Sequence, residues 1–175
     1  MEQVTREVLE NFLQELGKRT KTPTSLYLIG GSALILLGAP RETIDIDYLT
    51  DTKDRDLERA IKDLSTELQL DVEYVPLDEF IPLPSKSEER HRLMGRYGKL
   101  SLYIFDPYSI ALSKLDRGFE ADLEDVVFLI QRGLVSVSQL ERIVKDAIPQ
   151  ARQFDMSPRE LQSRLQAVRQ AVGNH

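Results

Sequence analysis

Two short segments in the first third of the chain constrain its fold more than any other part of the sequence. The first is Gly30-Gly31-Ser32, which follows an apolar run over residues 26–29 and precedes another over residues 33–37. This order predicts a strand, a tight turn and a helix, because paired glycines let the backbone turn sharply. Backbone N–H groups at such a turn can face phosphate oxygens. Taken alone, a glycine pair is equally typical of a turn that binds nothing.

The second segment is Asp45-Ile46-Asp47, in which polar and apolar residues alternate. A strand here would direct Ile44, Ile46 and Tyr48 to one face and both aspartates to the other. Two carboxylates on one face, about 7 Å apart by the rise of a strand, can share divalent ions carried by a nucleoside triphosphate. A phosphate-binding turn followed by a metal-binding strand predicts phosphoryl or nucleotidyl transfer.

Composition excludes several other kinds of site. The chain of 175 residues contains no cysteine, which excludes disulfides, thiolate metal sites and a cysteine nucleophile. With only two histidines, His91 and His175, we expect no histidine-built zinc site. The net charge of -6 argues against non-specific coating of nucleic acid, although it leaves room for a local basic groove.

Nothing in the sequence predicts contact with a membrane. No apolar run approaches the roughly 20 residues that a spanning helix needs. Residues 1–7 have neither the basic region nor the apolar core of a signal peptide. We therefore expect a cytoplasmic protein.

Hydrophobic periodicity predicts strands in the first part of the chain and only helices in the last part. We expect strands over residues 26–29, 44–48, 70–75 and 100–105, and a proline-marked loop over residues 76–87. We expect helices over residues 4–19, 54–68, 121–131, 137–147 and 158–172, and a further helix that Asp106-Pro107 opens.

Three or four short strands followed by helices predict an α/β (α+β) fold, in which a small mixed β-sheet is flanked by helices. The C-terminal helices are too few for an independent domain. We therefore expect a single domain over residues 1–175, with a core at about residues 20–106 and a helical C-terminal part at residues 107–175.

The stretch from Tyr27 to Leu49 resembles the nucleotidyltransferase superfamily of the polymerase-β type. More narrowly, residues 41–47 resemble the signature of the AbiEii-like branch, which combines an arginine, a threonine and paired aspartates. That branch includes toxins of toxin–antitoxin and phage-abortive systems, and a set of small uncharacterised nucleotidyltransferase-like proteins. The resemblance covers roughly residues 25–130 and implies the nucleotidyltransferase fold.

The resemblance also implies roles for the two segments. Asp45 and Asp47 would be catalytic and would bind Mg²⁺, with two ions expected when a nucleoside triphosphate is bound. The residues expected to hold the nucleotide are Gly30, Gly31, Ser32, Arg41, Thr43, Lys114 and Asp125.

In this superfamily a third carboxylate usually comes from a later strand. Asp71 and Glu73 are both candidates, because alternation places them on one face of the predicted strand. We prefer Asp71 as the metal ligand, since it is the first acidic residue to enter the strand, and Glu73 follows closely. Either carboxylate could instead be the base for the attacking hydroxyl, or simply belong to a solvated strand face.

Lys114 lies among apolar residues, where a lysine can also extend its amine to solvent. The AbiEii-like branch has a helical lysine in this place, followed by an Asp-x-x-Asp helix that matches Asp122 and Asp125. The resemblance implies that Lys114 neutralises triphosphate charge, and that Asp122 orients it or assists proton transfer. The opposite side of that helix should be buried by Val126, Val127 and Ile130.

A basic segment runs from Lys86 to Lys99. It could bind the phosphates of an RNA acceptor, but only Tyr97 and Tyr103 lie near it, so base stacking has little support. Its other interpretation is a solvated helix face, which is the more common fate of such a charge run.

Together these observations predict a Mg²⁺-dependent enzyme that moves a nucleotide from a nucleoside triphosphate to an acceptor hydroxyl on RNA or protein. It could belong to a toxin–antitoxin or phage-defence system and have a cognate antitoxin. The alternative is an inactive protein of the same fold that binds a partner through the helices after Ser136. Phe119 and Ala121 favour that alternative, because toxins of the branch usually carry basic residues just before the first aspartate of the helix.

Overall fold

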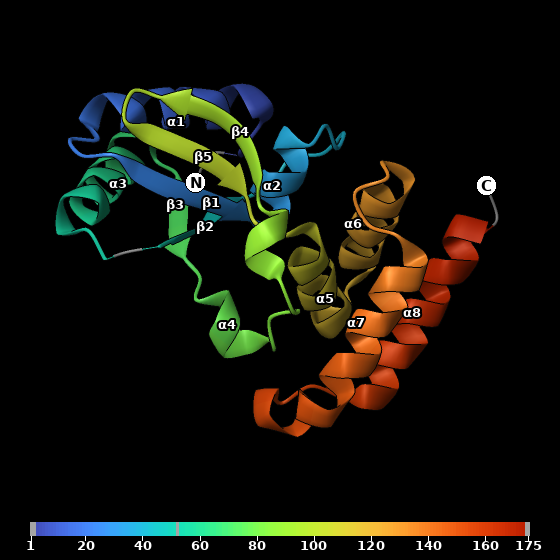
Figure 1. Ribbon diagram of the computed structural model, residues 1–175. Coiled ribbons are helices and arrows are strands. Elements are labelled where there is room, and N and C mark those ends of the chain that lie inside the picture. The colour runs from blue at the N-terminus through green and yellow to red at the C-terminus, as the bar shows by residue number, and fades with distance from the viewer. Residues whose placement is uncertain (1–2, 52, 174–175) are drawn as a thin grey trace. The chain divides into compact units, whose positions relative to one another are not determined.

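The computed structural model describes residues 3–51 and 53–173, which fold into two compact units (Figure 1). The first unit contains the residues up to Val75 together with His91–Phe105. The second contains Pro76–Arg90 and the residues from Asp106 onward. The single domain expected from the sequence stays a prediction.

The first unit is built on a five-stranded mixed sheet with strand order β3-β2-β1-β5-β4. The strands are β1 (Thr24–Ile29), β2 (Asp45–Thr50), β3 (Asp71–Tyr74), β4 (Arg92–Tyr97) and β5 (Leu100–Ile104). β1 runs parallel to β5, and β2 parallel to β3, whereas the β1–β2 and β4–β5 pairs are antiparallel. The predicted fold class, a small mixed sheet flanked by helices, is therefore confirmed.

Three helices complete this unit: α1 (Arg6–Arg19), α2 (Gly30–Leu36) and α3 (Arg55–Leu68). α1 and α3 pack on one face of the sheet, where alternate strand residues are buried. That buried set includes Leu26, Leu28, Ile46, Leu102 and Ile104. Asp45 and Asp47 lie on the opposite face, which we call the aspartate face. Strand alternation fixes this separation, because successive side chains point to opposite faces.

The second unit is helical and comprises α4 (Leu77–Phe80), η1 (Ser87–Arg90), α5 (Pro107–Arg117), α6 (Glu120–Gln131), α7 (Val137–Ala147), η2 (Ile148–Phe154) and α8 (Pro158–Gly173). Asp106 caps α5 as predicted, since its carboxylate accepts hydrogen bonds from the backbone N–H groups of Tyr108 and Ser109. Arg90 donates two hydrogen bonds of 2.8 Å to the same buried carboxylate.

The expected starts of two elements in the first unit, the first helix and the second strand, are wrong. Val4 does not belong to the first helix, because Thr5 caps α1 and its hydroxyl accepts a hydrogen bond from the backbone of Val8. Val4 instead forms an isolated bridge with Thr43. Ile44 is 69% exposed and does not share the buried face of Ile46, because β2 begins only at Asp45.

The segment from residue 76 to residue 99 also differs from its prediction. The expected loop, residues 76–87, contains α4, and the basic segment from Lys86 to Lys99 consists of η1 followed by β4 instead of forming one helix face. The strand escaped prediction because a register irregularity between Leu93 and Gly95 breaks its alternation. Within the residues that the structure describes, no helix combines the length and the apolar character needed to cross a membrane.

Candidate functional site

Asp45 and Asp47 occupy the first and third positions of β2, and both side chains are partly buried. Asp47 pairs in register with Ile29, the last residue of β1, so its carboxylate lies beside the start of α2. Thr43 donates a hydrogen bond of 3.3 Å from its hydroxyl to Oδ1 of Asp45. The geometry thus brings the two predicted carboxylates together with the glycine pair.

The glycines form the first turn of α2 itself, not a separate turn ahead of it. Gly30 has φ +66°, and a Cβ atom at this position would lie 2.9 Å from Oδ2 of Asp47. A Cβ atom at Gly31 would lie 2.8 Å from the hydroxyl of Thr43 and 3.4 Å from Nη2 of Arg41. Only glycine therefore lets the backbone approach these polar side chains so closely.

The hydroxyl of Ser32 is fully buried and donates a hydrogen bond of 3.1 Å to the carbonyl oxygen of Ile29. This bond ties the first turn of α2 to the end of β1. Among the groups of Ser32, only the backbone N–H is therefore suited to contact a phosphate.

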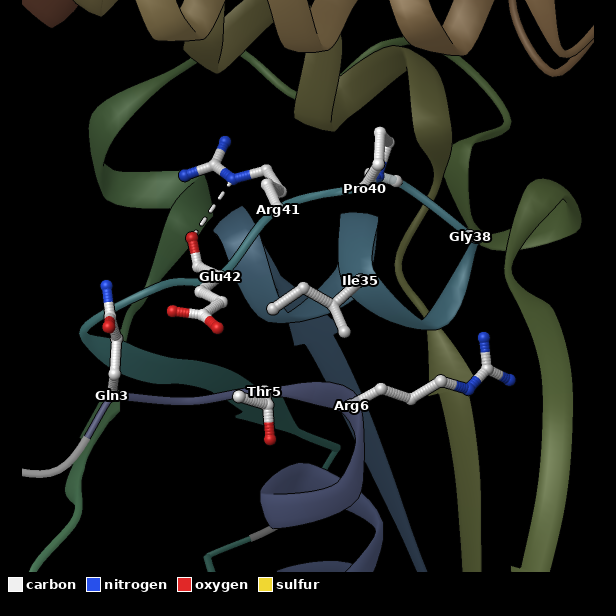
Figure 2. A pocket seen from close by; sticks show the side chains of 9 residues that line it. Gln3, Thr5, Arg6, Ile35, Gly38, Pro40, Arg41 and Glu42 are labelled. Carbon is white, nitrogen blue, oxygen red and sulfur yellow. Dashed lines mark hydrogen bonds between the residues drawn. The ribbon is translucent and has the colours of Figure 1, made fainter.

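Arg41 lies at a pocket of about 680 Å³ formed by the start of α1 and the segment that follows α2 (Figure 2). Its Nε donates a hydrogen bond of 3.4 Å to the carbonyl oxygen of Glu42. Figure 2 shows Arg41 and Glu42 on the opposite side of this pocket from Thr5 and Arg6. Because Nη2 of Arg41 also approaches Gly31, the guanidinium places a positive charge next to the glycine pair.

Strand register determines where the candidate third carboxylates lie. Asp71 pairs with Asp45, and Glu73 pairs with Asp47, so both point to the aspartate face. Both side chains are exposed. Across residues 3–51 and 53–173, no three acidic or histidine side chains converge on one metal position. The choice between Asp71 and Glu73 therefore stays a prediction, as does the third metal ligand itself.

The pair Asp45 and Asp47 nevertheless fits Mg²⁺ that arrives with a nucleotide. Mg²⁺ prefers oxygen ligands and is usually bound by one or two carboxylates, while phosphates and waters fill its remaining positions. Here two carboxylates on one strand face lie beside the backbone of Gly30, where a Cβ would crowd Asp47. The missing side chain at Gly30 leaves room beside the two carboxylates for other oxygen ligands of such an ion.

Lys114, Asp122 and Asp125 all belong to the second unit, where the structure brings them together. Nζ of Lys114 lies 2.7 Å from Oδ2 of Asp125 and 3.6 Å from Oδ1 of Asp122. All three residues are buried, with exposures of 5%, 1% and 5% for Lys114, Asp122 and Asp125. The face of α6 that carries the aspartates thus packs on α5 through ion pairs.

This arrangement corrects the expected orientation of α6. Val127 and Ile130 are partly exposed, and the buried apolar residues of the helix are Val126 and Leu129. The expected orientation is wrong because only the apolar residues were expected to be buried, whereas Lys114 offers the carboxylates a buried partner.

Arg117 binds the carboxylate of Asp122 at both oxygens, with distances of 2.8 Å and 2.7 Å. The backbone N–H of Phe119 donates a third hydrogen bond to Asp122, at 3.1 Å. Burial by itself would raise the pKa of Asp122, but the hydrogen bonds from Arg117 and the charge of Lys114 outweigh it and lower the pKa below its ordinary value. Asp122 is therefore held as a carboxylate.

The structure also assembles a group of aromatic rings that the sequence analysis missed. Tyr27, His91, Tyr103 and Phe105 lie together in the first unit, with Tyr27 and Tyr103 stacked at 5.1 Å. The signal was present, because Tyr103 and Phe105 alternate with buried residues along one predicted strand, as Tyr27 does along another.

Residues 6–170 match the model of a protein family described as "Nucleotidyltransferase of unknown function (DUF6036)". The fold is similar to the crystal structure of an antigenic nucleotidyltransferase-like protein from Paracoccidioides brasiliensis, with a TM-score of 0.52 over 95% of each chain. The two sequences are 13% identical, so this similarity concerns the fold. Among curated proteins, none matches the chain.

Proposed function

Because the chain belongs to this family of nucleotidyltransferases, which its model matches over residues 6–170, we propose that it transfers a nucleotide from a Mg²⁺-bound nucleoside triphosphate to an acceptor hydroxyl. The observation that supports this most directly is the contact between the glycine pair and the carboxylates. A Cβ at Gly30 would lie 2.9 Å from Oδ2 of Asp47. Backbone N–H groups, a guanidinium and two carboxylates thereby share one small region of the first unit.

Each of these groups has a part in the proposed reaction. Asp45 and Asp47 hold the metal, which supplies positive charge to the phosphates. The backbone at Gly31 and the guanidinium of Arg41 bind phosphate oxygens. The acceptor oxygen then forms a bond to the α-phosphorus, the bond from that phosphorus to the bridging oxygen breaks, and pyrophosphate leaves. The proton of the acceptor hydroxyl passes to a base, for which Asp71 and Glu73 are the candidates on the same sheet face.

We propose a role for Lys114 that differs from the neutralisation of triphosphate charge implied by the family resemblance. Its amine is held by two buried carboxylates, and with Arg117 the group of four charges is formally neutral. Such a group carries little net charge toward a triphosphate. Within the second unit its evident contribution is to join α5 to α6, so a direct role for Lys114 toward phosphate requires it to exchange Asp125 for the ligand.

The test is calorimetric titration of the purified protein with each nucleoside triphosphate in the presence of Mg²⁺. We expect saturable binding that Asp47→Asn abolishes, because this change removes a carboxylate charge and preserves side-chain shape. The matched control is Asp63→Asn, which makes the same change at an exposed position of α3 and should bind like the wild type. Labelled nucleotide then identifies the acceptor.

Two outcomes would contradict the proposal. The wild type could fail to bind any nucleoside triphosphate, which would favour the partner-binding alternative. Asp47→Asn and Asp63→Asn could also bind equally well, which would place the nucleotide away from β2. The toxin–antitoxin or phage-defence role rests on the AbiEii-like signature at residues 41–47 and is a finer prediction than the reaction itself.

A further inference from the structure

We propose that the aspartate face of the sheet also binds the acceptor, and that this acceptor is single-stranded RNA. The inference rests on the nucleotidyl transfer proposed above and names the second substrate of that reaction. Three rows of side chains on this face, each set by strand register, provide the argument.

The middle row is apolar and crosses four strands. Leu93 on β4 pairs with Tyr103 on β5, Tyr103 pairs with Tyr27 on β1, and Tyr27 pairs with Leu49 on β2. Leu93 is 49% exposed, and the other three side chains are partly exposed. The row gives the aspartate face a strip of apolar side chains, two of them aromatic, that a ligand with planar apolar groups could contact.

The rows on either side of it have opposite electrostatic character. Two residues along β1 from Tyr27, Ile29 pairs with Asp47, so the carboxylates begin about 7 Å from the apolar row. In the other direction, Arg96 pairs with Ser101, which lies opposite Ser25. Arg96 is exposed. On one side of the middle row the face thus offers a cation and two serine hydroxyls, and on the other side it offers the carboxylates proposed to bind the metal.

The rings of the middle row are held firmly by their neighbours. Tyr27 and Tyr103 stack at 5.1 Å with planes 22° apart, and the ring of His91 lies 4.8 Å from that of Tyr27. His91 in turn lies 4.3 Å from Phe105, and the hydroxyl of Tyr27 donates a hydrogen bond of 3.0 Å to Asp51. Because these rings are already fixed, a base that packs on them costs little additional ordering of the protein.

Single-stranded RNA carries the three groups that these rows would bind. Its phosphates suit Arg96, its bases suit the rings whatever their sequence, and its terminal hydroxyl would reach Asp47. The path from β4 to β2 crosses three strand spacings, about 14 Å, which gives room for more than one nucleotide. A protein acceptor would supply a hydroxyl but neither regular phosphates nor planar bases. The chain's charge of -6 confines any such binding to a local site.

The experiment measures binding of a fluorescently labelled single-stranded RNA of mixed sequence by anisotropy, without nucleoside triphosphate or Mg²⁺. Tyr103→Leu keeps the position apolar and removes the ring, and it should weaken binding about 5- to 150-fold. Arg96→Gln should reduce the slope of log affinity against log salt by about one. The matched control, Arg59→Gln, removes the same charge from the exposed surface of α3 and should leave both quantities unchanged.

Failure of this inference is distinguishable from failure of the proposed reaction, because the RNA titration needs no nucleotide. If the wild type binds a nucleoside triphosphate but no RNA, the RNA inference is wrong and the transfer proposal stands. Equal affinity of Tyr103→Leu and wild type, or transfer of labelled nucleotide to a protein, would also overturn it. Circular dichroism of Tyr103→Leu verifies that the variant is folded, and Arg96→Gln provides an independent test on an exposed residue.

Discussion

Replacing Gly30 by alanine tests the contact on which the candidate site depends. We expect two destabilising effects, backbone strain and side-chain crowding, and Gly133→Ala separates them because it causes only the first. Both glycines have left-handed backbones, with φ +66° at Gly30 and +73° at Gly133, so both variants carry a conformational cost of about 1–2 kcal/mol. A Cβ at Gly133 has nothing within 4 Å, whereas a Cβ at Gly30 would meet Oδ2 of Asp47 at 2.9 Å.

The extra crowding at Gly30 should cost about 1 kcal/mol more, the low end of the overpacking range, because the Asp47 carboxylate can rotate away. That rotation moves a proposed metal ligand. We therefore expect Gly30→Ala to bind Mg²⁺ and nucleoside triphosphate at least about tenfold more weakly than Gly133→Ala, a difference of about 1.4 kcal/mol. Urea unfolding and calorimetric titration measure the two quantities. Equal nucleotide affinity of the two variants would refute the reasoning.

Three further predictions concern buried or shielded charges. Lys114→Met leaves the Asp125 carboxylate buried without its cation and should lower the free energy of unfolding by about 3–5 kcal/mol, a loss that Lys114→Met/Asp125→Leu should largely reverse in urea unfolding. Because the pKa of Asp122 is lowered in the folded state, its ionisation stabilises the fold above the ordinary carboxyl pKa, and this stabilisation disappears as the pH falls through the lower folded value. Asp122→Asn should therefore flatten the acid side of the stability profile, and a loss that is independent of pH would contradict this. Burial, reinforced by the hydrogen bond to Asp51, raises the pKa of Tyr27 to about 12, so alkaline titration followed by ultraviolet absorbance should show a late tyrosine that is missing in Tyr27→Phe.

Much of the fold could be predicted from local sequence patterns, and the structure confirms these predictions. The alternation of polar and apolar residues assigns the side chains of β2 to the two faces of the sheet, and Asp106-Pro107 marks the start of α5. The last helices were predicted within a residue or two, because each has its own stop and start signals, such as Gly133 and Ser136 between α6 and α7. These features depend on residues that are close together in the sequence, so they can be predicted from the sequence alone.

The features that were missed depend on partners distant in sequence or on irregular backbone. The burial of Asp125 depends on Lys114, on the preceding helix, so the sequence alone could not distinguish it from a solvated acid. β4 was missed because the irregularity between Leu93 and Gly95 hides its period of two. The aromatic group was missed because Tyr27 and Tyr103 become neighbours only when β1 and β5 pair.

The pairing of β1 with β5 also determines how this protein can be divided. β1 lies at the centre of the sheet, between β2 and β5. Its partner β5 follows β3 in the chain only after the segment Pro76–Arg90, which belongs to the second unit. A fragment that stops at Val75 would leave the N–H and C=O groups along the β5 side of β1 unpaired, which invites association between copies. An isolated first unit must therefore rejoin Val75 to His91 and retain the strands through Phe105. By the same reasoning, limited proteolysis within Pro76–Arg90 should leave the sheet intact, because both severed ends remain anchored by paired strands.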